Sequence, residues 1–147
     1  MEKQIVAAVR IKGIADVPEK IRHTLDMLRL RKKFVCCIYK PTPSILGMLE
    51  KAKAYIAYGN INDEILKELI LKRGRKPGDK KLNQKEVEKV FAMLKEGNFD
   101  EAYKIIKPFF RLSPPRGGFK KTTKLMWPQG VCGNVGEKIN ELIARMI

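Results

Sequence analysis

The side chains of this sequence that could do chemistry are mostly cations, and they gather in short clusters. Four of the five positions from 29 to 33 are basic, and the segment 72–81 holds six cations against one acid. A third segment, 111–124, has five cations, no acid, a Pro-Pro pair and a Gly-Gly pair. Guanidinium and ammonium groups bind phosphate oxygens through charge-assisted hydrogen bonds, and glycine lets a backbone come close to an RNA backbone. The clusters therefore predict phosphate binding.

Residues that could support catalysis or metal binding are few and isolated. His23 is the single histidine and falls off the apolar side of its predicted helix, so we expect a surface residue rather than a base or a ligand. An enzyme could use Cys132 as a nucleophile, or Asp100 and Glu101 as acid/base groups, but none of them has a supporting partner in a motif. The glycine-rich segment 130–136 lacks the Lys-Ser or Lys-Thr pair of a phosphate loop. We expect no enzyme, metal, cofactor or small-molecule substrate.

The overall charge is strongly positive. Lys and Arg number 31 against 16 Asp and Glu, a formal charge of +15 on 147 residues, while an apolar content of 44% is ordinary for a folded protein. So many uncompensated positive charges on a compact protein repel one another, and the usual reason to tolerate this repulsion is a polyanionic partner that neutralises them. As that partner, nucleic acid is favoured over an anionic membrane surface. The N-terminus does not resemble a signal peptide, and no segment has the roughly 18 apolar residues of a membrane helix. We expect a cytoplasmic protein that binds nucleic acid and no membrane.

A strand and a helix lead into the first basic cluster. Alternation over 4–12 predicts a half-buried strand with one apolar and one more polar face. Asp16 and Glu19 predict a capping box for a helix that extends into the cations of 29–33. These cations would either complement the helix dipole or bind phosphate. We favour phosphate binding, because four cations exceed what capping requires.

A second strand is predicted over 34–39. It contains Cys36 and Cys37, which alternation places on opposite faces. With Cys132 the cysteines are odd in number, and the adjacent pair cannot readily form a disulfide. All three are expected to be reduced, and Cys36 and Cys37 to be buried small residues.

A second helix and a third strand complete this unit. Thr42 and the proline after it begin a helix whose apolar side includes Leu46, and Gly47 within it is expected to permit close approach of another backbone. The third strand is predicted over 54–58 and ends at Gly59. The order strand, helix, strand, helix, strand predicts a small sheet with two helices on one face.

The remaining residues, 61–147, predict a mostly helical extension that packs on this unit. Its predicted elements are a helix over 62–73, a basic loop over 72–81, two short helices over 84–107, a basic Pro/Gly loop over 111–124 and a helix over 135–146. The predicted caps are Asn62, and the pairs Asn83 with Glu86, Asn98 with Glu101, and Asn134 with Glu137. The loop over 72–81 should be mobile until RNA orders it, or be a solvated linker. The helices over 84–107 hold several of the chain's acids, which predicts an appendage that faces protein or solvent.

Several segments in the first sixty residues resemble one known family. They are Arg-Ile-Lys-Gly-Ile at 10–14, the run 28–33, Thr-Pro-Ser-Ile-Leu-Gly-Met at 42–48 and Tyr-Ile-Ala-Tyr-Gly at 55–59. Together and in this order they resemble the large-subunit ribosomal protein family called L-thirty in bacteria and L-seven in eukaryotes. The resemblance implies an α+β, ferredoxin-like β-α-β-α-β fold, with a three-stranded antiparallel sheet backed by two helices, that binds large-subunit ribosomal RNA.

The chain departs from the bacterial members of this family in two ways. Bacterial members often carry a basic residue just before the Gly-Met pair, where this chain has Leu46. The resemblance then implies that Lys40 and Ser44 are the RNA contacts at that turn. The chain also continues past residue 60 as the archaeal and eukaryotic branch does, and the Ser-Pro-Pro-Arg-Gly-Gly run at 113–118 resembles that branch.

The sequence therefore predicts a structural constituent of the large ribosomal subunit in the cytoplasm. The alternative is a free RNA-processing or small-RNA-binding factor with the same fold. Expected partners are large-subunit ribosomal RNA, with 5S rRNA among the candidates, and neighbouring large-subunit proteins. The predicted RNA-contacting residues are Arg10, Lys12, Arg29, Arg31, Lys32, Lys33, Lys40, Ser44, Arg73, Arg75, Lys76, Arg111, Ser113, Pro115, Arg116, Gly117, Gly118, Lys120, Lys121, Thr122, Thr123 and Lys124.

Overall fold

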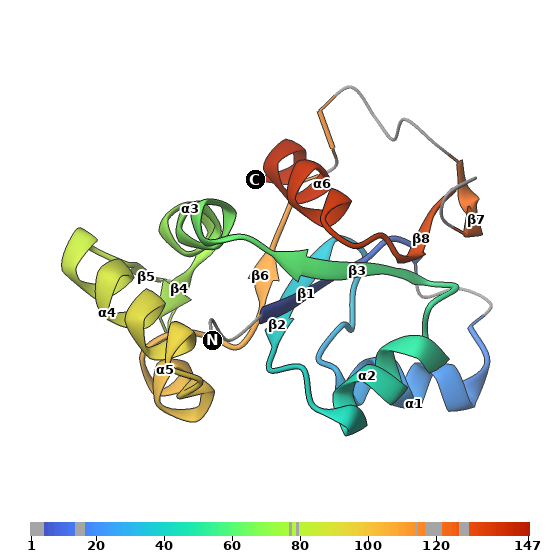
Figure 1. Ribbon diagram of the computed structural model, residues 1–147, viewed down its shortest axis with the longest axis horizontal. Coiled ribbons are helices and arrows are strands. Elements are labelled where there is room, and N and C mark those ends of the chain that lie inside the picture. The colour runs from blue at the N-terminus through green and yellow to red at the C-terminus, as the bar shows by residue number, and fades with distance from the viewer. Residues whose placement is uncertain are drawn as a thin grey trace.

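The computed structural model describes residues 5–13, 17–76, 78, 80–113, 115–116, 122–126 and 130–147, of which 122–126 and 131 enter as backbone alone. Within these residues, six strands form one sheet in the order β6-β2-β1-β3-β8-β7 (Figure 1). The strands of this sheet are β1 (Ile5–Arg10), β2 (Val35–Tyr39), β3 (Ile56–Ile61), β6 (Phe110–Arg111), β7 (Thr122–Met126) and β8 (Gly130–Asn134). The helices are α1 (Glu19–Met27), α2 (Pro43–Lys51), α3 (Asp63–Arg73), α4 (Gln84–Lys95), α5 (Phe99–Ile105) and α6 (Lys138–Met146).

The first three strands have the topology that the sequence predicts. β1 lies between β2 and β3 and is antiparallel to both, with Ala7 opposite Ile38 on one side and Gly59 on the other. Helices α1 and α2 cover one face of these strands (Figure 1), where Leu25 and Leu49 enter the core. The α+β, ferredoxin-like arrangement is therefore confirmed.

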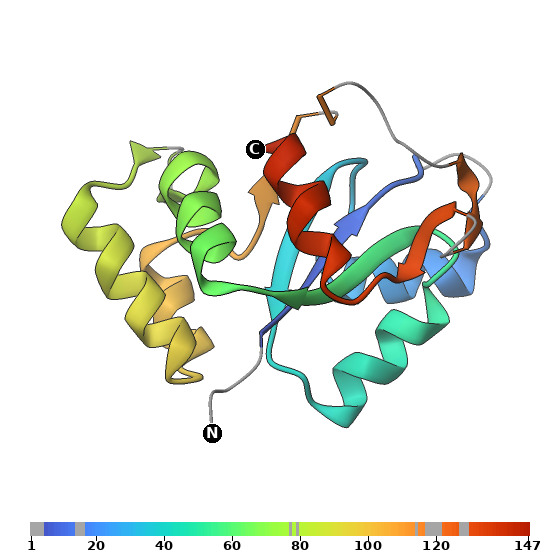
Figure 2. The ribbon, with the colours of Figure 1, turned by 45° about the horizontal axis from the view of Figure 1, so that its top comes forward.

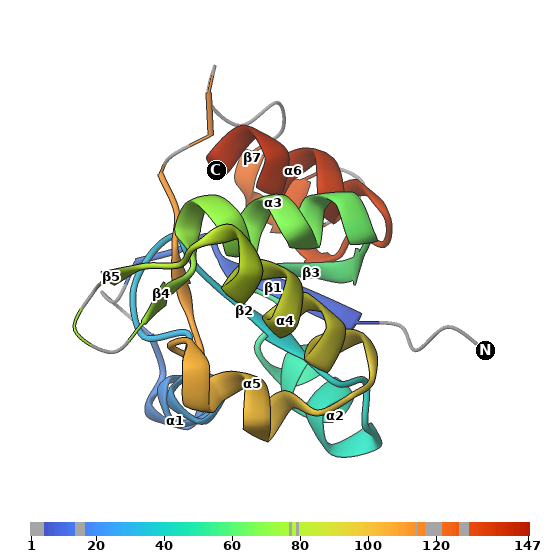
Figure 3. The same cartoon turned by 90° about the vertical axis from the view of Figure 1, so that its left-hand side faces the viewer.

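Strand β1 is buried on both faces, so the prediction of a half-buried strand is wrong. Val6 and Ala8 face the core under α1 and α2, whereas Ile5, Ala7 and Val9 belong to a second core. The second core is closed by α3, α4 and α6, and Figure 3 shows helices on both sides of the sheet. The helices that cover this second face follow β1 by more than fifty residues, so the alternation within β1 does not indicate that they are there.

The sheet extends beyond the three predicted strands. β6 pairs antiparallel with β2, with Val35 opposite Arg111, and β8 pairs parallel with β3, with Ala57 opposite Gly133. Figure 2 shows α6 crossing the sheet over β3 on the side opposite α1 and α2. These added strands are very short or rich in glycine, so their sequences carry little strand signal, and they pair with edges that the first three strands supply.

The close backbone approach expected at Gly47 lies at Gly59 instead. A Cβ atom at Gly47 would meet nothing within 4 Å, while one at Gly59 would collide with the carbonyl of Gly136. β3 does not end at Gly59 but continues to Ile61. This glycine lets the turn before α6 lie directly on the strand, and Val135 donates its N–H to the carbonyl of Tyr58 at 2.9 Å.

Three of the predicted helix caps are confirmed. Thr42, Asn62 and Asn83 each accept a hydrogen bond from the backbone N–H three residues later. Within α2, however, Leu46 is 43% exposed and so does not belong to the apolar side that was predicted for it.

None of the other three predicted caps forms the predicted capping bond within the described residues. Asp16 lies outside them, and Pro18 occupies the N-cap of α1. Asn98 occupies the N-cap of α5, as predicted, but makes no side-chain capping bond. Asn134 accepts from the N–H of Gly136 in a local turn, and α6 begins later, at Lys138. Asn and Asp side chains favour such turns as readily as helix caps, so spacing alone does not distinguish them.

The basic segment 72–81 contains a short hairpin, where the sequence predicted a structureless loop. β4 (Arg75–Lys76) pairs antiparallel with β5 (Lys80–Lys81), and Gly78 has a φ of 90°. The hairpin is tied to the body at two points. Arg75 accepts the N–H of Lys107 at 2.9 Å, and Lys76 forms an ion pair with Glu86 at 2.6 Å.

Candidate nucleic-acid interface

Helix α1 ends two residues before the first basic cluster. Arg29 has a left-handed φ of 64° and donates its N–H to Asp26, while Leu30 donates to the carbonyl of Leu25. This pattern of bonds is a Schellman motif, with arginine at the position usually held by glycine. The helix has no basic residue in its last turn, and the cations of 29–33 all lie after its C-cap, Leu28. Phosphate binding by this cluster stays a prediction.

The loop that carries the cluster is fixed at its other end by Phe34. This residue also has a left-handed φ, 66°, and its N–H donates to the carbonyl of Arg10 at 2.8 Å. Its carbonyl accepts from Leu112 at 3.1 Å, which joins the loop to the segment after β6. A non-glycine residue at positive φ costs of order 1 kcal/mol, so two of them in six residues indicate a conformation set by its surroundings.

Arg10 has a structural role in this loop. Its side chain is 2% exposed and donates to the carbonyls of Leu30 at 2.8 Å, Lys12 at 3.0 Å and Gly13 at 3.1 Å. Burial lowers the pKa of Arg10, and nearby Asp26 acts in the opposite direction. Three of the five N–H donors of Arg10 are thus bound within the protein, so its burial favours a structural role, and the RNA contact predicted for it stays a prediction that this burial does not support.

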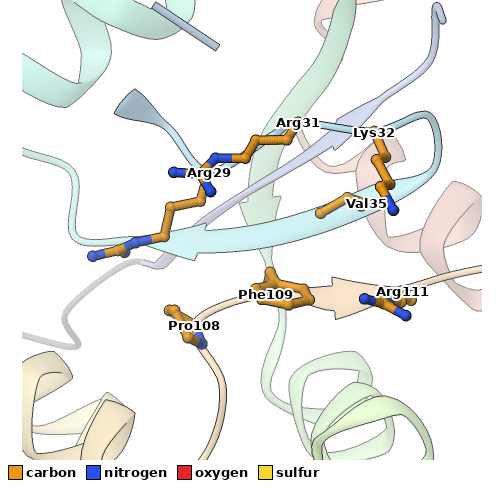
Figure 4. A pocket seen from close by; sticks show the side chains of 7 residues that line it. All are labelled: Arg29, Arg31, Lys32, Val35, Pro108, Phe109 and Arg111. Atoms are coloured by element: carbon orange, nitrogen blue, oxygen red, sulfur yellow. The ribbon is translucent and has the colours of Figure 1, made fainter. Parts of the chain in front are cut away.

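A pocket of about 360 Å³ opens between this loop and the segment around β6 (Figure 4). Arg29, Arg31 and Lys32 lie on one side of it, and Arg111 lies on the other. The remaining lining residues are Val35, Pro108 and Phe109. No acidic side chain in the described part of the chain lines this pocket. The register that sets Arg111 opposite Val35 is what brings the two basic segments together.

A second pocket adjoins the first and shares two of its residues, Phe109 and Arg111. It adds Arg73, Arg75 and Lys107 to the lining. We call the two pockets together the basic groove, whose cations are Arg29, Arg31, Lys32, Arg73, Arg75, Lys107 and Arg111. The groove thus joins predicted contact residues from three segments that are far apart in sequence.

The cations of the first pocket are poorly neutralised by the protein itself. Among the described residues, Arg29, Arg31, Lys32 and Arg111 belong to none of the ion pairs. Arg29 instead lies 5.4 Å from the ring centre of Tyr103, and Arg111 lies 5.8 Å from that of Phe109. Unpaired arginines over aromatic rings keep their N–H donors available for an anionic partner.

Sequence reasoning missed Lys107 and Phe109 as members of the groove. Phe109 and Phe110 are adjacent at a strand, so their side chains must point to opposite sides. Phe110 is fully buried, while Phe109 is half-buried against the cations. The signal was therefore present in the Phe-Phe pair, but it could be used only once 110–111 was known to be a strand.

Other predicted contact residues lie apart from the groove. Lys40 and Ser44 are exposed but follow the far end of β2, and Lys12 lies 5.4 Å from the ring centre of Tyr55. Lys33 is exposed beside Phe34. The structure therefore does not bring the Lys40 turn and the 29–33 cluster to one place.

The start of the 111–124 segment is fastened to the C-terminal helix. Ser113 donates its N–H to Met146, and its hydroxyl accepts from Arg73 at 2.8 Å. Arg116 is exposed, and its carbonyl accepts two hydrogen bonds from the guanidinium of Arg145. Pro115 is buried. Of the other predicted contacts, Gly117, Gly118, Lys120 and Lys121 lie outside the described residues, and Thr122, Thr123 and Lys124 are described by backbone alone, as part of β7.

The cysteines have the environment of structural residues. Cys36, Cys37 and Cys132 are buried and form no disulfide, and Cys36 and Cys37 lie in different cores. Burial raises the pKa of Cys37 to about 12, and it raises those of Cys36 and Cys132 as well. A nucleophilic cysteine needs the thiolate, which burial disfavours. His23 is exposed, as expected.

No group of three or more His, Cys, Asp or Glu side chains among the described residues could hold a metal ion. None of the helices described is both long enough and apolar enough to cross a bilayer.

The chain is similar along its length to known proteins. A family model described as Ribosomal protein L30p/L7e matches residues 6–56. A protein named large ribosomal subunit protein uL30 from Ignicoccus hospitalis is 41% identical, and the match covers 100% of both chains. Proteins of the same name from Staphylothermus marinus and Aeropyrum pernix are 43% and 41% identical, over 97% of this chain and 98% and 99% of theirs.

Proposed function

Because this chain belongs to the ribosomal protein L30p/L7e family, we propose that it is a structural constituent of the large ribosomal subunit that binds folded large-subunit ribosomal RNA. The family resemblance predicted from the sequence is confirmed by relatives that match the chain from end to end. Their printed names are those of ribosomal proteins, and the expectation that the chain is not an enzyme is confirmed with them. Its place of action is the cytoplasmic ribosome.

The basic groove is the observation that supports RNA binding. It gathers seven cations from the 29–32 loop, the β4 region and the β6 region. Phosphate contacts dominate the affinity of proteins for nucleic acid, and a chain with a formal charge of +15 has a net charge that matches such a partner. Double-helical RNA hides its major-groove base edges, so recognition there would rest on backbone and shape.

The two parts of the chain have different roles in this proposal. In this proposal the core unit lies within residues 1–60 and contains β1, β2, β3, α1 and α2, while the extension within 61–147 packs on it and adds β6, β7 and β8 to the sheet. The extension contributes Arg73, Arg75, Lys107 and Arg111 to the groove, so RNA would contact both parts. Helices α4 and α5 carry as many acids as lysines, unlike the basic groove, so we assign them to a neighbouring large-subunit protein or solvent and not to RNA. We include 5S rRNA among the candidate RNA partners.

Sedimentation of the native protein tests this function. In a cell lysate at physiological salt, the protein should sediment with the large subunit. A free RNA-processing or small-RNA-binding factor would instead sediment in lighter fractions with its RNA, and absence from the large-subunit peak would contradict the proposal. Footprinting of the bound protein on large-subunit RNA would then identify the helices that it protects.

A further inference from the structure

The pocket in Figure 4 has an apolar part that phosphate binding does not require. Val35, Pro108 and Phe109 contribute hydrocarbon and aromatic surface between the cations. A phosphate would use only the guanidinium and ammonium groups, since apolar surface offers it no hydrogen bond. The lining therefore indicates a ligand with a flat apolar part as well as negative charge.

The dimensions of the pocket suit one nucleotide. Its volume of about 360 Å³ lies near the lower end of the roughly 300–1,000 Å³ typical of small-ligand sites. A double helix lies on a surface and does not enter a pocket of this size. An unpaired nucleotide has a flat base and one charged phosphate on either side of it, which matches an aromatic residue surrounded by cations.

The pocket is also held in shape before any ligand binds. Arg29 and Phe34, both at positive φ, fix the two ends of the loop that carries Arg31 and Lys32. Backbone pairing between Val35 and Arg111 fixes the opposite wall. Pre-formed sites spend less binding free energy on ordering, so this geometry favours a specific ligand over diffuse electrostatic attraction.

We propose that this pocket binds a single unpaired nucleotide of the large-subunit RNA. The base stacks on the ring of Phe109, and the flanking phosphates are bound by Arg31, Lys32 and Arg111. This inference rests on the function proposed above and adds a base contact to it. An acidic peptide with an aromatic side chain is the competing ligand, but the excess of arginine beside an aromatic ring favours RNA.

The test compares full-length variants for affinity to protein-free large-subunit RNA at several salt concentrations. Phe109→Leu keeps apolar volume but removes the stacking face, so its affinity should fall roughly 5- to 150-fold. The slope of log affinity against log salt should not change, because stacking releases no counterions. Phe109→Trp keeps a stacking face and should bind as the wild type does. This second variant keeps the test decisive if Phe109→Leu is too unstable to assay.

Phe91→Leu is the matched control. Phe91 is also half-buried and also lies beside a cation, with Lys67 Nζ 4.7 Å from its ring centre, but it is on α4, away from the pocket. This variant should bind RNA with wild-type affinity. A short oligoribonucleotide should likewise lose at least 5-fold in affinity when an abasic site replaces its bound nucleotide, and only with Phe109 present.

The outcomes separate this inference from the proposed function. If Phe109→Leu binds RNA as tightly as the wild type while both show a steep salt response, the pocket does not hold a base, although the protein still binds RNA. If Phe109→Leu loses only the binding of an acidic, aromatic peptide, the pocket is a protein-docking site and the inference is overturned. If the wild type does not bind large-subunit RNA, both proposals fail.

Discussion

The guanidinium of Arg10 donates to the carbonyl of Leu30 at 2.8 Å, across twenty residues of chain. Leu30 follows Arg29 in the Schellman motif, so this bond fixes the start of the basic loop to the end of β1. The bond also explains why a cation at the end of a central strand can be buried, since it replaces the water that its donors would otherwise bind.

Replacing Arg10 should destabilise the protein. Arg10→Met removes three hydrogen bonds and leaves the buried carbonyl of Leu30 without that donor, which should lower the free energy of unfolding by about 2–4 kcal/mol. Denaturant unfolding measures this. Arg31→Ala is the control, because Arg31 is exposed and should change stability by less than about 0.5 kcal/mol. Equal stability of the two variants would contradict the structural role of Arg10.

Replacing Arg31 should change the affinity for RNA and the salt dependence of that affinity, and not the stability of the fold. If the protein neutralises six to ten phosphates, its affinity should fall roughly 10³- to 10⁵-fold between 50 and 200 mM salt. Arg31→Ala removes one contact and should reduce the slope of log affinity against log salt by about 1. Lys85→Ala, an exposed cation on α4, should leave the slope unchanged. A wild-type affinity that does not respond to salt would contradict phosphate binding altogether.

Two glycines give a paired prediction about stability. Gly59→Ala places a Cβ against the carbonyl of Gly136, so β3 and the turn before α6 must move apart, and we expect a loss of about 2 kcal/mol or more. Gly47→Ala adds a Cβ in open space within α2 and should stabilise by about 0.5–1 kcal/mol. Thermal unfolding of the two variants compares them directly. Stabilisation by Gly59→Ala would show that α6 does not lie on β3 as described.

The sequence predicted the local features of this fold well and the long-range ones poorly. Alternation and helical spacing located β1, α2 and α3, because these patterns depend on neighbouring residues. The second helical layer and the pairing of β6 and β8 depend on segments more than fifty residues away. Local sequence patterns do not predict such long-range contacts. For this reason the sequence predicts a solvent-exposed face for β1, which the structure shows to be buried.

The candidate site shows the same division. The sequence singled out Arg29, Arg31 and Lys32 as cations in excess of what capping requires and Arg111 as part of a basic loop, and the structure places all four around one pocket. The same reasoning included Arg10, whose charge looked identical in sequence but whose side chain is buried. It left out Phe109, because a half-buried aromatic residue becomes a candidate only when its neighbours in space are known.

The burial of Cys37 predicts how stability should depend on pH. Burial raises its pKa from an ordinary 9.0 to about 12, although Tyr39 and Arg29 act in the opposite direction. Below pH 9 the Cys37 thiol keeps its proton in both the folded and the unfolded chain, so its contribution to the free energy of unfolding is fully present. Between pH 9 and 12 only the unfolded chain releases it, and the free energy of unfolding should fall by up to about 1.4 kcal/mol per pH unit. Cys37→Ala removes this contribution, so its free energy of unfolding should decline less steeply from pH 9 to 10.5 in denaturant titrations at each pH. Parallel declines in the two proteins would show that Cys37 titrates alike in the folded and unfolded states.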